Sequence, residues 1–271
     1  MAFHHKILGI VTLLYLCLFL IHIIYFASKK EKIKGVIWFV LYGTLGLQTI
    51  GLILRWVESY QLGIGHAPLS NFYESLIFYS WCVSLILVLM KKRLNYPAIT
   101  VFGALISLFL VGYASISPSI DRNIQPLVPA LQSNWLHIHV FTCFIAYASF
   151  VVSFICGLLY MFIWKSIIPP RETLEEINYR SVIVGFPMLS AGIFTGAVWA
   201  HYAWGSYWSW DPKETWSLIT WIIYALFLHA RLVRGWKGKK IAILSIIGFV
   251  SVIFTYFGVN FILSGLHSYA T

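Results

Sequence analysis

Two kinds of side chain in this sequence could do chemistry: a dense run of tryptophans and a set of histidines near the ends of apolar segments. Six of the twelve tryptophans lie between Trp199 and Trp221, and 202–210 contains five aromatic rings. A segment that only crosses a membrane normally uses aliphatic residues there. Aromatic faces beside small residues such as Gly205 and Ser206 suit a ligand that is flat, wide and apolar with a polar edge.

The alternative for the tryptophans is a belt at the membrane surface, where Trp and Tyr commonly gather. A belt would spread over many helix ends, whereas half of the tryptophans here fall within 199–221. We therefore predict a ligand-binding aromatic surface. The residues expected to form it are Trp199, Trp204, Gly205, Tyr207, Trp208, Trp210, Asp211 and Trp216.

The end of the aromatic run carries the signature of a helix start. Asp211 is placed as the N-cap, Pro212 as the first helical residue, and Glu214 as the third residue of a capping box. This cap predicts that a helix begins at 212. The aromatic residues before it are then expected to form a short amphipathic segment at the membrane surface.

Two histidines are expected at the same membrane face as the aromatic run: His139 and His267. Two imidazoles flanking an aromatic surface are what axial ligation of a haem iron requires. His137 points away from His139 on a helix, so both cannot be ligands, and we favour His139. His66 and His201 are weaker candidates. For each histidine alone, a structural hydrogen-bonding role is the alternative.

His229 and His22 lie at comparable depth inside apolar segments. An ionisable residue within a membrane span is costly and by default functional. The two could be partners, although nothing in the sequence brings them together. Histidine sites at two depths would suit a molecule that crosses the membrane. His4 and His5, near the N-terminus, are expected to be solvated.

The composition excludes a soluble domain, because 60% of the residues are hydrophobic and only 10% are charged, against about 25% in soluble proteins. Eight apolar runs are long enough to cross a bilayer. We predict an all-α, polytopic bundle of eight transmembrane helices forming one domain over 1–271, with 165–180 as a short surface helix and connector. The predicted spans are 6–28, 35–57, 71–90, 97–115, 135–164, 181–200, 215–234 and 241–264.

The net charge of +10 indicates topology and not a nucleic-acid partner. Fifteen of the nineteen Lys and Arg fall in four connections, at 29–34, 91–93, 165–180 and 231–240. These are alternate connections, so the positive-inside rule puts all four inside and both termini outside.

We expect no cleaved leader, because the basic cluster follows the first span. No Cys-x-x-Cys pair occurs, and buried structural thiols are expected at Cys17, Cys82, Cys143 and Cys156.

The segment 204–216 resembles the tryptophan-rich WWD signature of haem-handling proteins. Other stretches look like the CcsA (ResC) branch of the System II cytochrome c biogenesis family. The resemblance covers about 66–271, and the first two spans match only in character. The stretches are Pro68–Ser75, Gly185–Pro187, Gly196–Ala200 and Gly265–Tyr269.

The resemblance implies that haem b is taken from the inner side and presented outside for attachment to an apocytochrome c with a Cys-x-x-Cys-His site. It implies a CcsB (ResB) partner in a cytochrome c synthetase and, indirectly, thiol-reducing proteins. The family's outer iron ligands map to His139 and His267, and its inner site maps to His229. The second inner ligand then lies on the CcsB component, with His22 as the alternative in this chain. Lys213 could meet the haem propionates, but we expect it to be solvated.

Three other functions remain open at this point. A HemX-type regulatory protein would not obviously need the outward histidines and the WWD segment. A CcmC-like protein that loads a haem chaperone is typically six-span. An electron-transfer cytochrome b subunit would need deep histidine pairs, which only His22 and His229 could supply. The expected location is the bacterial cytoplasmic membrane, or the thylakoid membrane for a plastid protein.

Overall fold

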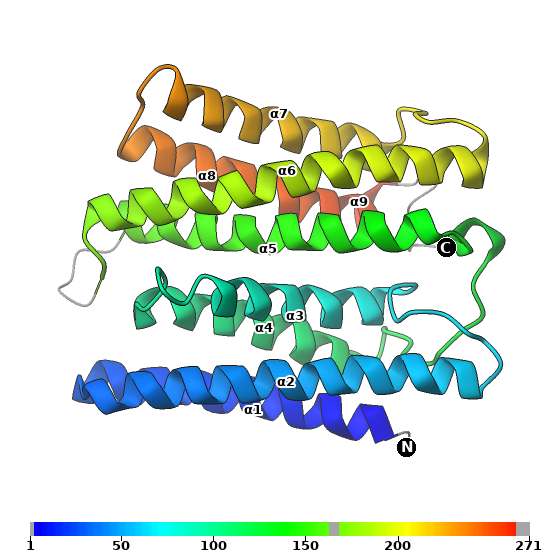
Figure 1. Ribbon diagram of the computed structural model, residues 1–271, viewed down its shortest axis with the longest axis horizontal. Coiled ribbons are helices and arrows are strands. Elements are labelled where there is room, and N and C mark those ends of the chain that lie inside the picture. Colours follow the sequence, from blue (N-terminus) through cyan, green and yellow to red (C-terminus); the bar gives the residue numbers. More distant parts are fainter. Residues whose placement is uncertain (1–2, 163–167, 264–271) are drawn as a thin grey trace. The chain divides into compact units, whose positions relative to one another are not determined.

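The computed structural model describes residues 3–162 and 168–263, and every regular element in these ranges is helical. Eight of the helices are long and apolar enough to cross a membrane, which confirms the predicted all-α multi-span architecture. His267 lies outside the described residues. The chain divides into two compact units, residues 1–127 and 128–271, each with its own helices (Figure 1).

The first unit is a bundle of four helices. α1 packs against α2 and α4, and α3 packs against the same two helices. Its interior contains polar groups that satisfy one another, as the absence of water in a bilayer requires. The Tyr15 hydroxyl donates to Gln48, whose amide donates to the Ile77 carbonyl at 2.9 Å. The helices are α1 (Phe3–Ser28), α2 (Glu31–Gln61), α3 (Phe72–Leu89) and α4 (Pro97–Ile116).

A buried ion pair ties α2 to the start of α3. Arg55 Nε lies 2.8 Å from Glu74 Oε1, and both side chains are 1% exposed. The other Glu74 oxygen accepts bonds from the Ser70 backbone N–H and hydroxyl, and the Arg55 guanidinium also donates to the Arg122 carbonyl at 2.9 Å. Asn71 caps α3 by accepting from the Glu74 N–H at 2.9 Å.

The expectation that His4 is solvated is wrong. Its side chain is 1% exposed, because α1 already begins at Phe3 and carries the ring onto α2. Arg55 always donates, so its bond to His4 Nε2 makes that nitrogen an acceptor. The proton therefore sits on Nδ1, which donates to Glu58 at 2.6 Å. His5 is half-buried, with Nδ1 3.3 Å from the Tyr73 hydroxyl.

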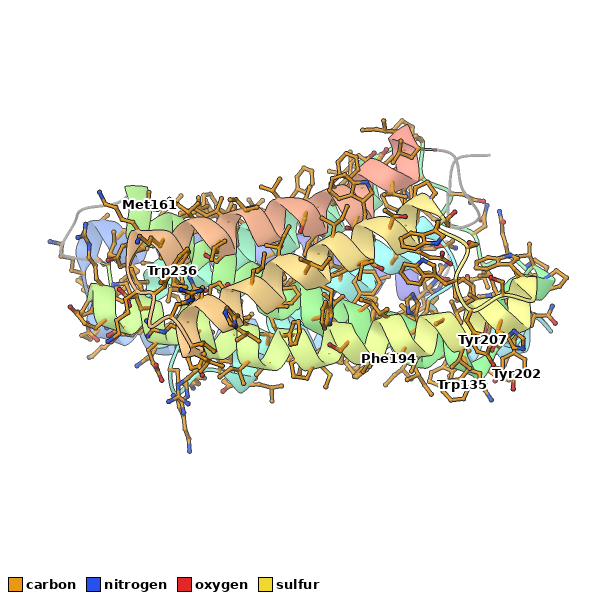
Figure 2. The ribbon with its side chains drawn as sticks, turned by 90° about the horizontal axis from the view of Figure 1, so that it is seen from above. Trp135, Met161, Phe194, Tyr202, Tyr207 and Trp236 are labelled. Carbon is orange, nitrogen blue, oxygen red and sulfur yellow. The ribbon has the colours of Figure 1, made fainter. Side chains whose placement is uncertain are left out.

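The second unit is built on the long pair α5 and α6. α8 packs on α5, and α7 packs on both α6 and α8. Figure 2 shows Trp135, Tyr202 and Tyr207 at one end of these helices and Met161 and Trp236 at the other. The elements are η1 (Pro129–Leu131), α5 (Asn134–Phe162), α6 (Arg171–Trp204), α7 (Pro212–Leu232), α8 (Lys239–Ile253), the π-helical turn η2 (Phe254–Gly258) and α9 (Val259–Ile262).

Within 168–180, the described part of the expected surface helix and connector, the chain forms no separate helix, because α6 runs without a break from Arg171. The first turns of α6 have tertiary partners that fix them in the helix. Glu175 accepts bonds from Arg231 and from the Gly238 backbone N–H, which joins these turns to the connection between α7 and α8.

Of the four cysteines, Cys17 is exposed on the protein surface, against expectation, and the other three are buried.

Replacing Glu74 by Gln leaves the buried Arg55 charge without its carboxylate. We expect a loss of about 3–5 kcal/mol in the free energy of unfolding, the range for removing one partner of a buried pair. The matched control is Glu31→Gln, which breaks the solvent-facing pair with Lys34 and costs less than about 1 kcal/mol. Thermal unfolding of the purified protein in detergent measures both, and equal midpoints for the two variants would contradict the assignment.

Candidate functional site

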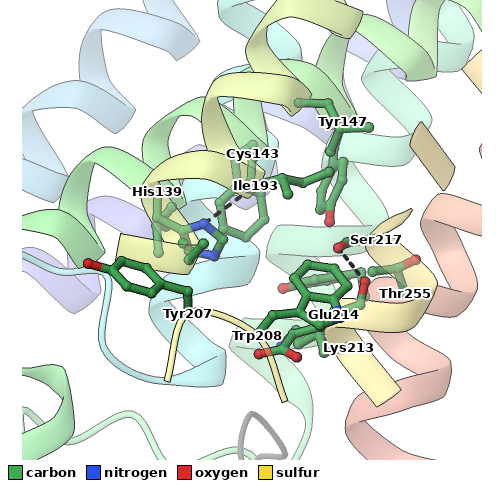
Figure 3. A pocket seen from close by; sticks show the side chains of 16 residues that line it. His139, Cys143, Tyr147, Ile193, Tyr207, Trp208, Lys213, Glu214, Ser217 and Thr255 are labelled. Atoms are coloured by element: carbon green, nitrogen blue, oxygen red, sulfur yellow. Dashed lines mark hydrogen bonds between the residues drawn. The ribbon is translucent and has the colours of Figure 1, made fainter. Parts of the chain in front are cut away.

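A pocket of about 840 Å³, including its open mouth, lies within the second unit at the end of the helices that carries Tyr207 (Figure 3). Small-molecule sites combine apolar walls with a few polar groups, and the lining of this pocket has that composition. The walls come from α5, α6, the 205–211 loop, the first turns of α7, and η2. The aromatic lining residues are Phe144, Tyr147, Tyr207, Trp208 and Tyr256.

His139, on the second turn of α5, is held in one orientation in the pocket wall. Its Nδ1 lies 2.7 Å from the Gly192 carbonyl oxygen, which can only accept, so Nδ1 carries the proton. The ring's lone pair is then on Nε2, the form that a metal-binding imidazole uses. The ring stacks on Trp199, with centroids 5.9 Å apart and planes at 24°.

The expected aromatic surface is divided among three positions. Trp199 lies behind His139 and donates from Nε1 to the Ala130 carbonyl, while Trp204 meets Trp199 edge-on at 4.9 Å. Tyr207 and Trp208 line the pocket itself. Trp210 is 68% exposed. The aromatic run therefore supplies both the pocket wall and the support for the histidine.

Trp216 occupies a different place, inside the helical part of the unit. Its ring packs on Phe254 of η2 with centroids 4.1 Å apart. Its carbonyl accepts a bond from Thr220 at 2.8 Å and another from Thr255 at 3.3 Å. Trp216 thus joins α7 to the π-helical turn next to the pocket.

The loop from Gly205 to Asp211 is held by the predicted cap. Gly205 ends α6 with φ +79°, a conformation that glycine adopts readily. The Glu214 carboxylate accepts from the backbone N–H groups of Ser209 at 2.7 Å and Asp211 at 3.2 Å, and Asp211 accepts from the Lys213 N–H. The capping box is confirmed. Trp210 has φ +60°, a strained value for a bulky residue, and Glu214 bonds to the residues on both sides of it.

Lys213 is not solvated, contrary to expectation. Its side chain is half-buried in the pocket wall, and Nζ donates to Asn260 Oδ1 at 2.9 Å. The backbone is turned this way because the Asp211 cap fixes the first turn of α7. The pair brings an ammonium group and an amide together beside the aromatic walls.

Sequence reasoning missed several lining residues that a helical spacing would have found. Cys143 and Tyr147 follow His139 by one and two turns of α5 and line the same pocket. The Cys143 sulfur lies 3.7 Å from His139 Nδ1 (Figure 3). Thr255 had no sequence signal, because η2 interrupts the helical period there.

The weaker histidine candidates have other partners. His201 is exposed and stacks on Tyr207 with centroids 4.3 Å apart. His66, in the first unit, is buried, and its ring nitrogens contact the carbonyls of Ala67 and Gln125. His137 is half-buried and is not among the described residues that line the pocket.

The two histidines expected at depth have opposite environments. His22 is fully buried in the first unit, with Nδ1 2.7 Å from the Leu18 carbonyl and Nε2 2.9 Å from the Thr100 hydroxyl. His229, in the last turn of α7, is exposed on the surface of the second unit. Both nitrogens of His22 thus have partners within its own bundle, whereas the ring of His229 faces outward.

Comparison with known proteins gives a consistent set of relatives. The model of the family described as "Cytochrome C assembly protein" matches residues 69–267. The cytochrome c biogenesis protein CcsA of Chlamydomonas reinhardtii is 44% identical over 229 residues, covering 80% of this chain and 64% of that protein. The CcsA proteins of Guillardia theta and of a Prochlorococcus marinus strain are each 40% identical, covering 88% and 82% of this chain and 88% and 80% of theirs.

A solved structure shares the fold. The chain titled "Cytochrome c Heme Lyase CcmF" superposes with a TM-score of 0.68 at 13% sequence identity. The match covers 93% of this chain and 46% of that one, so the present chain spans less than half the length of that relative.

Gly196→Ala tests how tightly the His139 ring is held. A Cβ at this position would lie 2.6 Å from His139 Nδ1, so the ring must move off the Gly192 carbonyl. We expect a loss of about 1–3 kcal/mol in the free energy of unfolding, typical of overpacking. The control is Gly112→Ala, whose Cβ meets no atom within 4 Å. Thermal unfolding that is equally unaffected in both variants would contradict the close packing.

Proposed function

The chain belongs to the cytochrome c assembly protein family, and we propose that it binds haem b in the pocket around His139 and presents it for attachment to apocytochrome c. Its eight apolar helices make it a multi-pass membrane protein, and its family gives it a role in cytochrome c maturation. The relatives come from algae and cyanobacteria, and we propose a thylakoid or bacterial cytoplasmic membrane as the location.

The observation that carries the proposal is the orientation of His139. An axial histidine presents one nitrogen to the iron while the other donates to an acceptor that fixes the ring. The bond from Nδ1 to the Gly192 carbonyl supplies that second feature, and the stacked Trp199 supplies a rigid backing. The aromatic rings that line the pocket offer apolar faces to a flat macrocycle.

We propose His267 as the second axial ligand. The match to the family model extends to this residue, and it follows the last predicted span at the same membrane face as the aromatic run. The proposal for His267 rests on the sequence and the family resemblance.

Bound haem supplies the vinyl groups to which the two thiols of a Cys-x-x-Cys-His site add. The chain's own residues bind and orient the macrocycle. Tyr207 and Trp208 belong to the loop held by Glu214, so one wall of the pocket depends on a capping interaction. The reaction needs reduced thiols, and thiol-reducing proteins are therefore proposed as indirect partners.

We propose that His229 belongs to an inner haem site shared with a CcsB (ResB)-like membrane protein. Its exposed ring on α7 can be reached by another chain. His22 is the less suitable inner ligand, because both of its ring nitrogens contact groups of its own bundle. An exposed imidazole in a membrane span is costly unless a partner or ligand covers it.

The outer site is tested by the absorption spectrum of haem that copurifies with the protein. His139→Ala removes the proposed ligand, and we expect a loss of most bound haem or a change in its Soret and α bands, with partial recovery when imidazole is added. His137→Ala is the control on the same helix, and we expect it to leave the spectrum unchanged. His267→Ala should resemble His139→Ala.

Two results would overturn the proposed function. Haem absent from the wild-type protein, purified with and without its partner, would exclude a haem site. Normal c-type cytochromes in a strain that lacks the gene would favour the HemX-type regulatory alternative.

The two deep histidines should respond differently to substitution. We expect His22→Ala to lower the free energy of unfolding by about 1–3 kcal/mol, since it leaves buried hydrogen-bonding groups without their partner, and to leave the haem spectrum unchanged. His229→Ala should leave stability unchanged and alter the spectrum only when the CcsB-like partner is copurified. The reverse pattern would assign the inner ligand to His22.

A further inference from the structure

We infer that Lys213 binds a carboxylate of the macrocycle and thereby decides which edge of it faces out of the pocket. The inference rests on the proposed function, and it adds the group that this part of the wall recognises. Lys213 is on α7, whereas His139 is on α5, so the two side chains approach the pocket from different walls (Figure 3).

The charged side chains of the wall have different tasks. Besides the titratable His139, the described lining residues include the charged Lys213 and Glu214. Glu214 Oε2 accepts from the Ser209 N–H at 2.7 Å, the Ser209 hydroxyl at 3.2 Å and the Asp211 N–H at 3.2 Å, so the carboxylate holds the loop. Among the described lining residues, Lys213 carries the positive charge that can meet an incoming anion.

The Asn260 amide is a replaceable partner for this ammonium group. Asn260 Nδ2 donates to the Tyr256 carbonyl, which turns Oδ1 towards Lys213 Nζ at 2.9 Å. A carboxylate is a stronger acceptor for an ammonium group than a neutral amide is, because the bond is then charge-assisted on both sides. We expect a ligand carboxylate near the wall to replace Asn260 as the hydrogen-bond acceptor of Lys213.

The π-helical turn places Asn260 where it can meet Lys213. Turns of this kind insert an extra residue into a helix and are frequent at functional sites. η2 ends at Gly258, two residues before Asn260, and its Thr255 and Tyr256 line the same pocket. The irregular part of this helix thus provides both a pocket wall and the amide that holds Lys213.

Two fixed points determine how a flat ligand lies in a pocket. Iron at the centre of haem b would be held by His139, and rotation about that bond would leave the edge of the ring undefined. The two carboxylates of haem b are on one edge and its vinyl groups are on another. A carboxylate held by Lys213 removes this freedom, so Lys213 acts as a positioning residue for the vinyl groups.

The experiment compares haem b with haem dimethyl ester, in which both carboxylates are blocked, by titrating each into the purified protein and following the Soret band. We expect the wild type to bind haem b more tightly than the ester. Lys213→Gln should weaken haem b binding by about ten- to hundredfold, the range for one hydrogen bond to a charged group, and leave the ester unchanged. Lys237→Gln, at an exposed lysine between α7 and α8, is the matched control and should change neither.

A second variant tests the exchange of partners. Asn260→Asp keeps the shape of the side chain and puts a carboxylate in contact with Lys213 in place of the amide oxygen. We expect this variant to lose the preference for haem b over the ester, as Lys213→Gln does. Its ester affinity reports whether the pocket remains intact.

The outcomes separate the two proposals. If Lys213→Gln weakens haem b and the ester equally, or changes neither, the inference about Lys213 is wrong while the haem site stands. If the wild type, with its partner, binds neither compound, the proposed function fails and this inference fails with it.

Discussion

The close approach of α5 and α6 is the constraint on which the site depends. A Cβ at Gly192 would lie 2.5 Å from the Cys143 sulfur, and one at Gly196 would lie 2.6 Å from His139 Nδ1. In a bilayer the helices gain nothing from hiding apolar surface from water, so small residues that let backbones pack closely drive their association. The same packing brings the Gly192 carbonyl to His139. The orientation of the proposed iron ligand is therefore a direct consequence of how two helices pack.

The second dependence runs through the start of α7. One Glu214 carboxylate satisfies backbone donors of a loop that has no regular structure of its own, and Asp211 completes the cap from the other side. The loop carries Tyr207 and Trp208 into the pocket wall, and the capped turn carries Lys213 into it. A local helix-start signal thus positions both an aromatic wall and a charge, and loss of Glu214 would disturb both together.

The sequence predicted what local rules determine. Spans follow from hydropathy, and the cap at Asp211 follows from a side chain that accepts a backbone N–H group nearby. The prediction that His4 is solvated was wrong because the burial of His4 depends on Glu58 and Arg55, which are distant in the sequence. The prediction that Lys213 is solvated was wrong for a similar reason. Its partner Asn260 follows a π-helical turn, and such a turn has no hydrophobic period that the sequence would reveal. For both residues, partners that are distant in the sequence determine the burial of the side chain, and local propensities do not.

The two deep histidines show why a site inside a membrane cannot be assigned from depth alone. Judged by hydropathy, His22 and His229 have the same free-energy cost of insertion into a membrane. Only His22 offsets that cost within its own bundle, through hydrogen bonds with Leu18 and Thr100. His229 is exposed on α7, and lipid offers an imidazole no hydrogen bond. We propose that a ligand or a neighbouring protein covers His229. This imbalance supports the proposal that the chain works as one part of a complex.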